Sequence, residues 1–172
     1  MAVTYQGFST SDARIARNGL ATIEEIIDPD LLVPNLDADT KIGAIKELVD
    51  RLHAKGVVED SLSFLQSVLE REALHSTILH DVALPHARSL AVNQMGMALG
   101  IARRPIDFPS GDERGSIQLI CLIAVPARAS HQYISLLGTL ARTFTNIEFK
   151  NALLHCASSQ DLYHLLSSHT VS

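Results

Sequence analysis

The feature that most constrains the fold is the segment Ile117 to Val125, IQLICLIAV, in which one glutamine interrupts an otherwise apolar run. A run without alternation between polar and apolar positions is typical of a strand buried on both faces in the middle of a sheet. Pro126 follows it directly, and because proline donates no backbone hydrogen bond, the strand is expected to end there. The run is also too short to cross a bilayer, which takes roughly 18 apolar residues or more.

Segments with apolar residues at helical spacing lie on both sides of this strand in the sequence. We expect a helix from Asp39 or Thr40 to Lys55-Gly56, one from Asp60 or Ser61 to about Arg71 or Ala73, one over 131–144 capped by Ser130, and shorter ones over 149–156 and 161–166, the last capped by Ser158 or Ser159. The expected buried stripes of the first three are Ile42, Ile45, Leu48, Val49 and Leu52; Leu62, Leu65, Val68 and Leu69; and Ile134, Leu137, Leu140 and Ala141.

Two further strands are expected, at 82–84 and at 95–101, the first ended by Pro85 and the second by the sequence Arg103-Arg104-Pro105. Residues 107–115 are rich in turn formers and predict a loop, and 23–36 predict a short structured lead-in without a long helix. Residues 1–22 are polar and aperiodic and predict an extension, partly ordered at best, outside a domain of residues 23–172. Because helices and strands alternate, the fold class is expected to be α/β, a sheet covered by helices.

The composition narrows the classes of function. With 172 residues, 47% of them hydrophobic, the chain can bury the core of one domain. The net charge is −5, from 14 basic and 19 acidic residues, and no basic block suggests nucleic-acid binding. Cys121 and Cys156 lie in apolar contexts, which predicts buried free thiols and a reducing compartment. Without a signal-peptide pattern or a membrane-spanning run, the expected location is the cytoplasm, without membrane insertion.

Several kinds of site find no support in the sequence. Among the eight histidines, His75, His80 and His86 are spaced five and six apart, which matches neither a helical pair nor a zinc-finger spacing. The cysteines form no CxxC motif, so no metal site is predicted. The nucleophile elbow of hydrolases is absent, and Gly96 and Gly100 are too far apart for a nucleotide-binding loop. No cofactor is predicted either.

Three residues could share one chemistry. His86 follows Pro85 behind a strand and is expected on a loop, Arg71 ends a helix, and His131 begins one. Phosphohistidine chemistry needs a nucleophilic imidazole, a cation to offset the phosphate charge, and a group that holds the phosphoryl oxygens. The ordinary interpretation is a surface histidine, a solvated helix end and a helix-start residue. Spacing alone leaves both interpretations open and favours the ordinary one.

The residues around His86 add a resemblance. Arg71-Glu72, Ser76-Thr77 and Val82-Ala83-Leu84-Pro85-His86 resemble the active-site segment of enzyme IIA domains of the bacterial phosphotransferase system, of the fructose/mannitol type that includes the nitrogen-regulatory enzymes IIA. The resemblance extends from about residue 23 to residue 169. It implies a single mixed β-sheet flanked by helices on both faces.

The resemblance also implies roles for the three residues. His86 would accept a phosphoryl group from the phosphocarrier protein HPr and pass it to a IIB partner. Arg71 would offset the phosphate charge, and His131 would orient the phosphate. No IIB module is recognisable, which favours a free-standing IIA, either a component of sugar transport or a regulator with its own target protein.

Two departures keep an alternative open. Residues 78–81 (ILHD) contain no glycine and form an apparently shorter turn than the family's glycine-rich one, and His75 stands where a small residue is usual. A regulatory domain that keeps the fold and binds a partner without being phosphorylated would explain them. Arg88, two residues after His86, is a possible second cation.

Overall fold

The computed structural model describes residues 22–129 and 132–169, and its centre is one mixed sheet of six strands. The strands are β1 (Leu32–Leu36), β2 (Ile78–Leu79), β3 (Val82–Ala83), β4 (His86–Ser89), β5 (Gly96–Ser110) and β6 (Glu113–Pro126). They lie in the order β1-β5-β6-β3-β2, and β4 also pairs with β6. The apolar run of the sequence is therefore central, as predicted, and its strand reaches Pro126.

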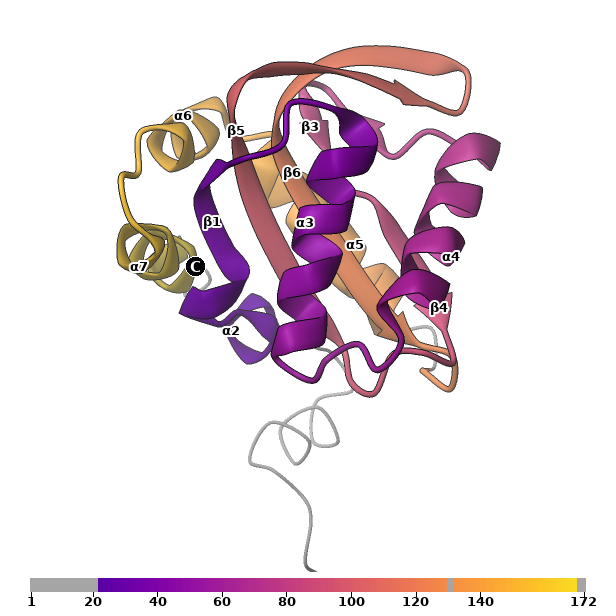
Figure 1. The fold of residues 1–172 in the computed structure, drawn as a ribbon. Coiled ribbons are helices and arrows are strands. Elements are labelled where there is room, and N and C mark those ends of the chain that lie inside the picture. The colour runs from indigo at the N-terminus through magenta and orange to yellow at the C-terminus, as the bar shows by residue number, and fades with distance from the viewer. Residues whose placement is uncertain (1–21, 130–131, 170–172) are drawn as a thin grey trace, which may run out of the picture.

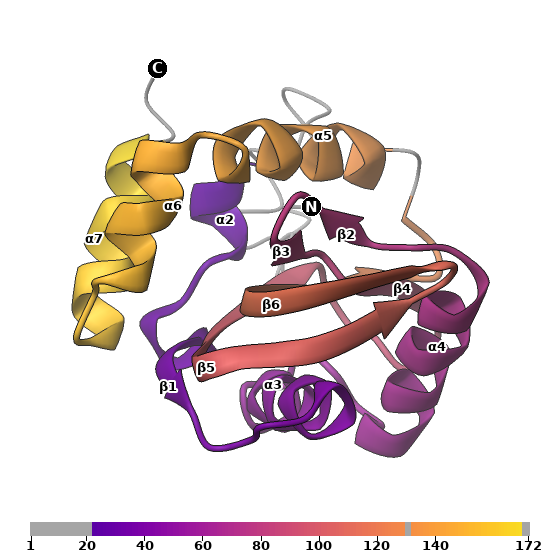
Figure 2. The ribbon, with the colours of Figure 1, turned by 90° about the horizontal axis from the view of Figure 1, so that it is seen from above.

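Helices cover both faces of the sheet (Figures 1 and 2). One layer holds α3 (Lys41–Ala54) and α4 (Ser61–Leu74); the other holds α2 (Ile23–Ile26), α5 (Gln132–Phe144), α6 (Ile147–Leu154) and α7 (Ser159–His169). Along β6, Ile120 and Leu122 join the core under α3 and α4, while Cys121 and Ile123 join the core under α5 to α7. Both sets are apolar because both faces are covered, and this explains the lack of alternation in the sequence.

The helix starts follow from side-chain caps. Thr40 accepts a hydrogen bond from the backbone N–H of Gly43 (3.1 Å), and Asp60 accepts one from Ser63 (3.1 Å), as predicted. Ser158 likewise accepts from the N–H of Asp161 at the start of α7. The predicted cap Ser130 lies outside the described residues, as does the predicted extension apart from Thr22, the N-cap of α2.

The predicted buried faces of α3, α4 and α5 were wrong at the first residue of each. Ile42, Leu62 and Ile134 are 59%, 74% and 54% exposed. The residues that face the core in their place are Ala44, Phe64 and Leu136. In α4 the sheet-facing positions are Phe64, Val68 and Glu72, one turn apart, and Leu62 points away from that row.

The predicted loop over 107–115 was wrong, because β5 and β6 continue through it as a long hairpin (Figure 2). Pairing slips between Ile101 and Ile106, and this irregularity accommodates Pro105, which has no N–H for the ladder. Beyond it Ile106 and Phe108 are buried while Asp107 is exposed. The tip turns at Gly111, whose φ of 56° is left-handed.

The predicted lead-in contains a short 3₁₀ helix, η1 (Pro29–Leu31), and the strand β1, which pairs in parallel with β5. Pro34 is tolerated in β1 because the strand lies at the sheet edge. Both cysteines are free, but only Cys121 is fully buried, and burial raises the pKa of its thiol. No helix in the described part of the chain is long and apolar enough to span a membrane.

Candidate active site

His86 is the first residue of β4, and not a loop residue as the sequence suggested. β3 and β4 both pair in parallel with β6 in one continuous register, with Ala83 opposite Ile120 and His86 opposite Ile123. Pro85 interrupts this ladder because it has no N–H, and its carbonyl still accepts from the N–H of Ile123 (3.0 Å). The histidine is therefore half-buried on a rigid strand.

One hydrogen bond fixes the imidazole of His86. Its Nδ1 lies 2.8 Å from the carbonyl oxygen of Leu84, and because a carbonyl only accepts, Nδ1 carries the proton. In the neutral ring the lone pair is then on Nε2. Burial lowers the pKa of His86 below its usual 6.5. Three smaller effects act on the same pKa: the hydrogen bond to Leu84 raises it, the charge of Arg71 lowers it, and the charge of Glu72 raises it. At neutral pH the site thus offers an unprotonated Nε2.

Arg71 lies in the last turn of α4, which packs against β4. Its Nη1 donates a long hydrogen bond (3.5 Å) to the carbonyl of His75, the C-cap residue. The charge of the guanidinium lowers the pKa of His86, so these two predicted residues are near enough to interact electrostatically. The third, His131, lies outside the described residues.

Glu72, next to Arg71, is 1% exposed and organises a buried polar network. Its carboxylate accepts hydrogen bonds from the hydroxyls of Thr77 and Ser110 and pairs with the ammonium of Lys41 (3.1 Å). The N–H of Thr77 in turn donates to the Ser110 hydroxyl (2.9 Å). The network ties the end of α4 to the loop after it, to α3 and to the β5–β6 hairpin, and it fixes the helix end that carries Arg71.

Gly111 at the hairpin tip completes this contact. Its N–H donates to the backbone carbonyl of Glu72 (2.7 Å). A Cβ at this position would lie 2.6 Å from the backbone nitrogen of Ser76, too close for any real contact. Together with the left-handed φ, this restricts the position to glycine.

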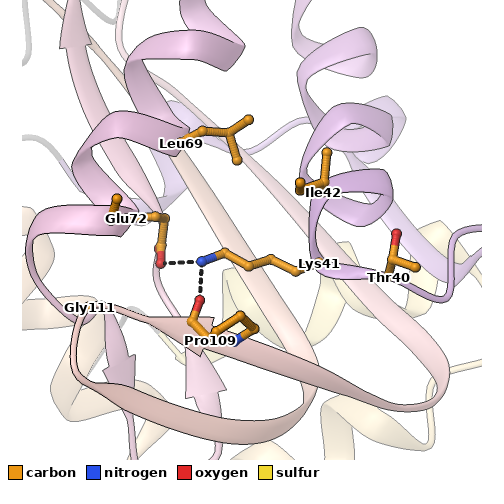
Figure 3. A pocket seen from close by; sticks show the side chains of 8 residues that line it. Thr40, Lys41, Ile42, Leu69, Glu72, Pro109 and Gly111 are labelled. Atoms are coloured by element: carbon orange, nitrogen blue, oxygen red, sulfur yellow. Dashed lines mark hydrogen bonds and ion pairs between the residues drawn. The ribbon is translucent and has the colours of Figure 1, made fainter.

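The Lys41–Glu72 pair borders a groove of about 760 Å³ (Figure 3). The groove is lined by Thr40, Lys41, Ile42, Leu69, Glu72, Ala73, Pro109 and Gly111. The ammonium of Lys41 is held by Glu72 and by the carbonyl of Pro109. His86 and Arg71 are not among the lining residues, so the groove is separate from the imidazole.

The glycine-free turn noted in the sequence joins β2 to β3 at His80-Asp81. His80 adopts φ = 57° there, a conformation that favours glycine. Asp81 forms an ion pair with Lys150 of α6, which anchors the turn. The turn therefore forms without glycine, and the backbone of one residue, His80, is strained.

Comparison with known proteins decides the family. The family model described as phosphoenolpyruvate-dependent sugar phosphotransferase system, EIIA 2, matches residues 25–169. The chain belongs to this family. The predicted resemblance is thereby confirmed, as is the mixed sheet with helices on both faces.

Three similar proteins show which relatives this EIIA chain has. A fructose-specific EIIA component of the phosphotransferase system from Haloferax volcanii is 30% identical over 129 residues, which cover 74% of this chain and 83% of that protein. A nitrogen regulatory protein from Bradyrhizobium diazoefficiens is 25% identical, covering 84% and 94%. The crystal structure of nitrogen regulatory protein IIA-Ntr from Neisseria meningitidis superposes with a TM-score of 0.75 at 26% identity, covering 84% and 98%.

Sequence reasoning missed the residues that support the site. It singled out Glu72 and Thr77 as parts of a motif, without partners for either. Their partners Lys41 and Ser110 lie 31 and 38 residues from Glu72 in the chain. The carbonyl of Leu84, which selects the tautomer of His86, carries no signal in the sequence at all.

Proposed function

We propose that this EIIA-family protein is a phosphoryl carrier and that His86 is the acceptor. Nε2 attacks the phosphorus of a phosphorylated HPr-type carrier, the bond from phosphorus to the donor atom breaks, and an Nε2–P bond forms. The group then passes to a IIB partner or is retained as a signal to a regulatory target. The hydrogen bond from Nδ1 to the Leu84 carbonyl carries the proposal, because it leaves the lone pair on Nε2.

The low pKa of His86 supports the same reaction. A protonated imidazole has no lone pair to donate, so a lowered pKa favours the unprotonated, nucleophilic form of His86. After transfer, Nδ1 still carries its proton and the Leu84 carbonyl still accepts from it. The ring is therefore held in one orientation before and after the reaction, as transfer between fixed groups requires.

Arg71 supplies the positive charge. Phosphoryl transfer depends mainly on positioning and on stabilising charge at the phosphoryl oxygens, and a planar guanidinium can bind two of them at once. The network around Glu72 holds the helix end that carries Arg71, whose charge acts on His86. The family resemblance adds His131 as the residue that orients the phosphoryl group.

A second function is favoured by one observation. The strained, glycine-free turn at His80 departs from the family pattern, and a domain that binds a regulatory target without being phosphorylated could tolerate such a change. The similarity to proteins named for nitrogen regulation fits either a phosphorylated or an unphosphorylated regulator.

Intact-mass spectrometry separates the two functions. The protein is incubated with phosphoenolpyruvate, enzyme I and HPr, beside the variants His86→Ala and His80→Ala. We expect one added phosphoryl group in the wild type and in His80→Ala, and none in His86→Ala. Folding of each variant is checked by circular dichroism. An unmodified wild type in the presence of a cognate HPr would overturn the carrier function and leave the binding domain.

A further inference from the structure

Arg88 lies two residues after His86 on the same short strand, β4. Side chains two apart on a strand point to the same side, so His86 and Arg88 are neighbours on one side of β4, while Ala87 and Ser89 are buried on the other. The sequence suggested Arg88 as a second cation for the phosphate. The structure shows its guanidinium engaged elsewhere.

Within the described residues, Arg88 donates two hydrogen bonds, and both go to the segment that connects β6 to α5. Its Nη2 donates to the carbonyl oxygen of Ala127 (2.7 Å) and to that of Ala129 (3.1 Å). Its Cζ lies 5.7 Å from the centre of the Tyr133 ring, in the first turn of α5. One side chain thus spans the connection from its beginning to the start of the next helix.

Backbone hydrogen bonds hold the same connection as well. The N–H of Ala127 donates to the carbonyl of Ser89 (3.1 Å), which extends the pairing of β4 beyond the end of β6. The N–H of Ala129 donates back to Pro126 (3.0 Å). The carbonyls of Ala127 and Ala129 point to Arg88, whose charged guanidinium is a stronger hydrogen-bond donor than a neutral N–H group.

We propose that Arg88 is a positioning residue for phosphoryl transfer: it clamps residues 127–129 to β4 and so sets where α5 begins relative to His86. The inference rests on the proposed function, because its consequence is a rate of transfer. In the sequence, His131 follows Ala129 by two positions. The clamped residues 127–129 thus come just before the residue proposed to orient the phosphoryl group.

The chemistry of the clamp favours arginine over lysine. A planar guanidinium can donate to two carbonyls and still lie over an aromatic ring, whereas a lysine ammonium is a compact, strongly hydrated charge. Arg88→Lys should keep part of the function, and Arg88→Gln should lose it. Arg103→Gln is a matched control, because Arg103 is an exposed β5 arginine paired with Asp37.

Two measurements on the full-length protein test the clamp. The first is hydrogen exchange of the amides of Ala127 and Ala129, which we expect to accelerate in Arg88→Gln, less in Arg88→Lys and not in Arg103→Gln. The second is the single-turnover rate of phosphorylation by phospho-HPr. We expect Arg88→Gln to slow it roughly ten- to hundredfold, since small misplacements have effects of this size.

A double-mutant cycle with His131→Ala shows through which residue Arg88 acts. If Arg88 acts by placing His131, Arg88→Gln has little further effect once His131 is removed. Independent, multiplying effects would overturn the proposal, as would unchanged exchange at 127 and 129, or altered exchange with an unchanged rate. If the wild type takes up no phosphate, the carrier function fails, and the exchange result still decides whether the clamp exists.

Discussion

The buried pair of Lys41 and Glu72 gives the sharpest prediction of stability. Glu72→Gln keeps the shape of the side chain, but it removes the charge opposite Lys41 and replaces one of the two oxygens that accept from the hydroxyls of Thr77 and Ser110 by an NH2 donor. The side chain of Lys41 is 13% exposed and that of Glu72 1%, so the ammonium loses a partner that water replaces only in part. Removing one member of a buried ion pair costs about 3–5 kcal/mol.

The local structure sets where in this range the effect falls. Lys41 keeps the carbonyl of Pro109, and the groove beside it admits water (Figure 3). We therefore expect the lower end, a loss of about 3 kcal/mol in the free energy of unfolding. Lys41→Met removes the other charge, and the double variant should lose at least about 1 kcal/mol less than the two single losses added together.

Urea unfolding followed by circular dichroism measures all three variants. Asp50→Asn is the matched control, because Asp50 pairs with Lys46 on the exposed side of α3 at 2.9 Å, with both side chains more than half exposed. Exposed pairs contribute about 0–1 kcal/mol. If Glu72→Gln lost no more stability than Asp50→Asn, or if the effects of Glu72 and Lys41 were additive, the reasoning from burial would be refuted.

Three further predictions concern single positions. The pKa of His86, followed by NMR of the imidazole, should lie below 6.5, and a midpoint above 6.5 would contradict the account. Because the folded-state pKa is lowered, the neutral imidazole contributes fully to the free energy of unfolding above pH 6.5, and this contribution is lost as the pH falls through the folded-state pKa. His80→Gly should be more stable than His80→Ala by about 1 kcal/mol in urea unfolding, since both remove the imidazole and only glycine relieves the left-handed φ; equal stabilities would argue against that strain. Gly111→Ala should lose more than about 1 kcal/mol by the same assay, because it adds a Cβ against Ser76 to a left-handed φ, and a neutral effect would show that the hairpin tip is not held there.

The elements that the sequence predicted well are those whose signal is local. The run at 117–125 is apolar throughout because both faces of β6 are covered, and the caps Thr40 and Asp60 bond to N–H groups three residues away. The strand β1 was missed because it is short, lies at an edge and contains Pro34. The outer hairpin was missed because Pro105 and the polar residues around it resemble a loop, although Ile106 and Phe108, separated by Asp107, show the alternation of a strand.

The residues of the site also divide into those with a local signal in the sequence and those without one. Pro85-His86 and the end of a helix at Arg71 are local patterns, and they led to two residues whose charges interact in the structure. Lys41, Ser110 and the contacts of Arg88 depend on pairing across the sheet and on chain segments far apart in sequence. No spacing rule within one segment could have found them.

The atom that carries the phosphoryl group is the central claim, and phosphorus–proton correlation NMR of the phosphorylated protein tests it most directly. We predict coupling of the phosphorus to both carbon-bound ring protons of His86, as expected for attachment at Nε2, which lies between Cδ2 and Cε1, while Nδ1 keeps its hydrogen bond to the Leu84 carbonyl. A phosphoryl group on Nδ1 of His86 would couple to the Cε1 proton alone and would contradict the tautomer that the structure assigns. Phosphorylation of any other histidine would contradict the account as a whole.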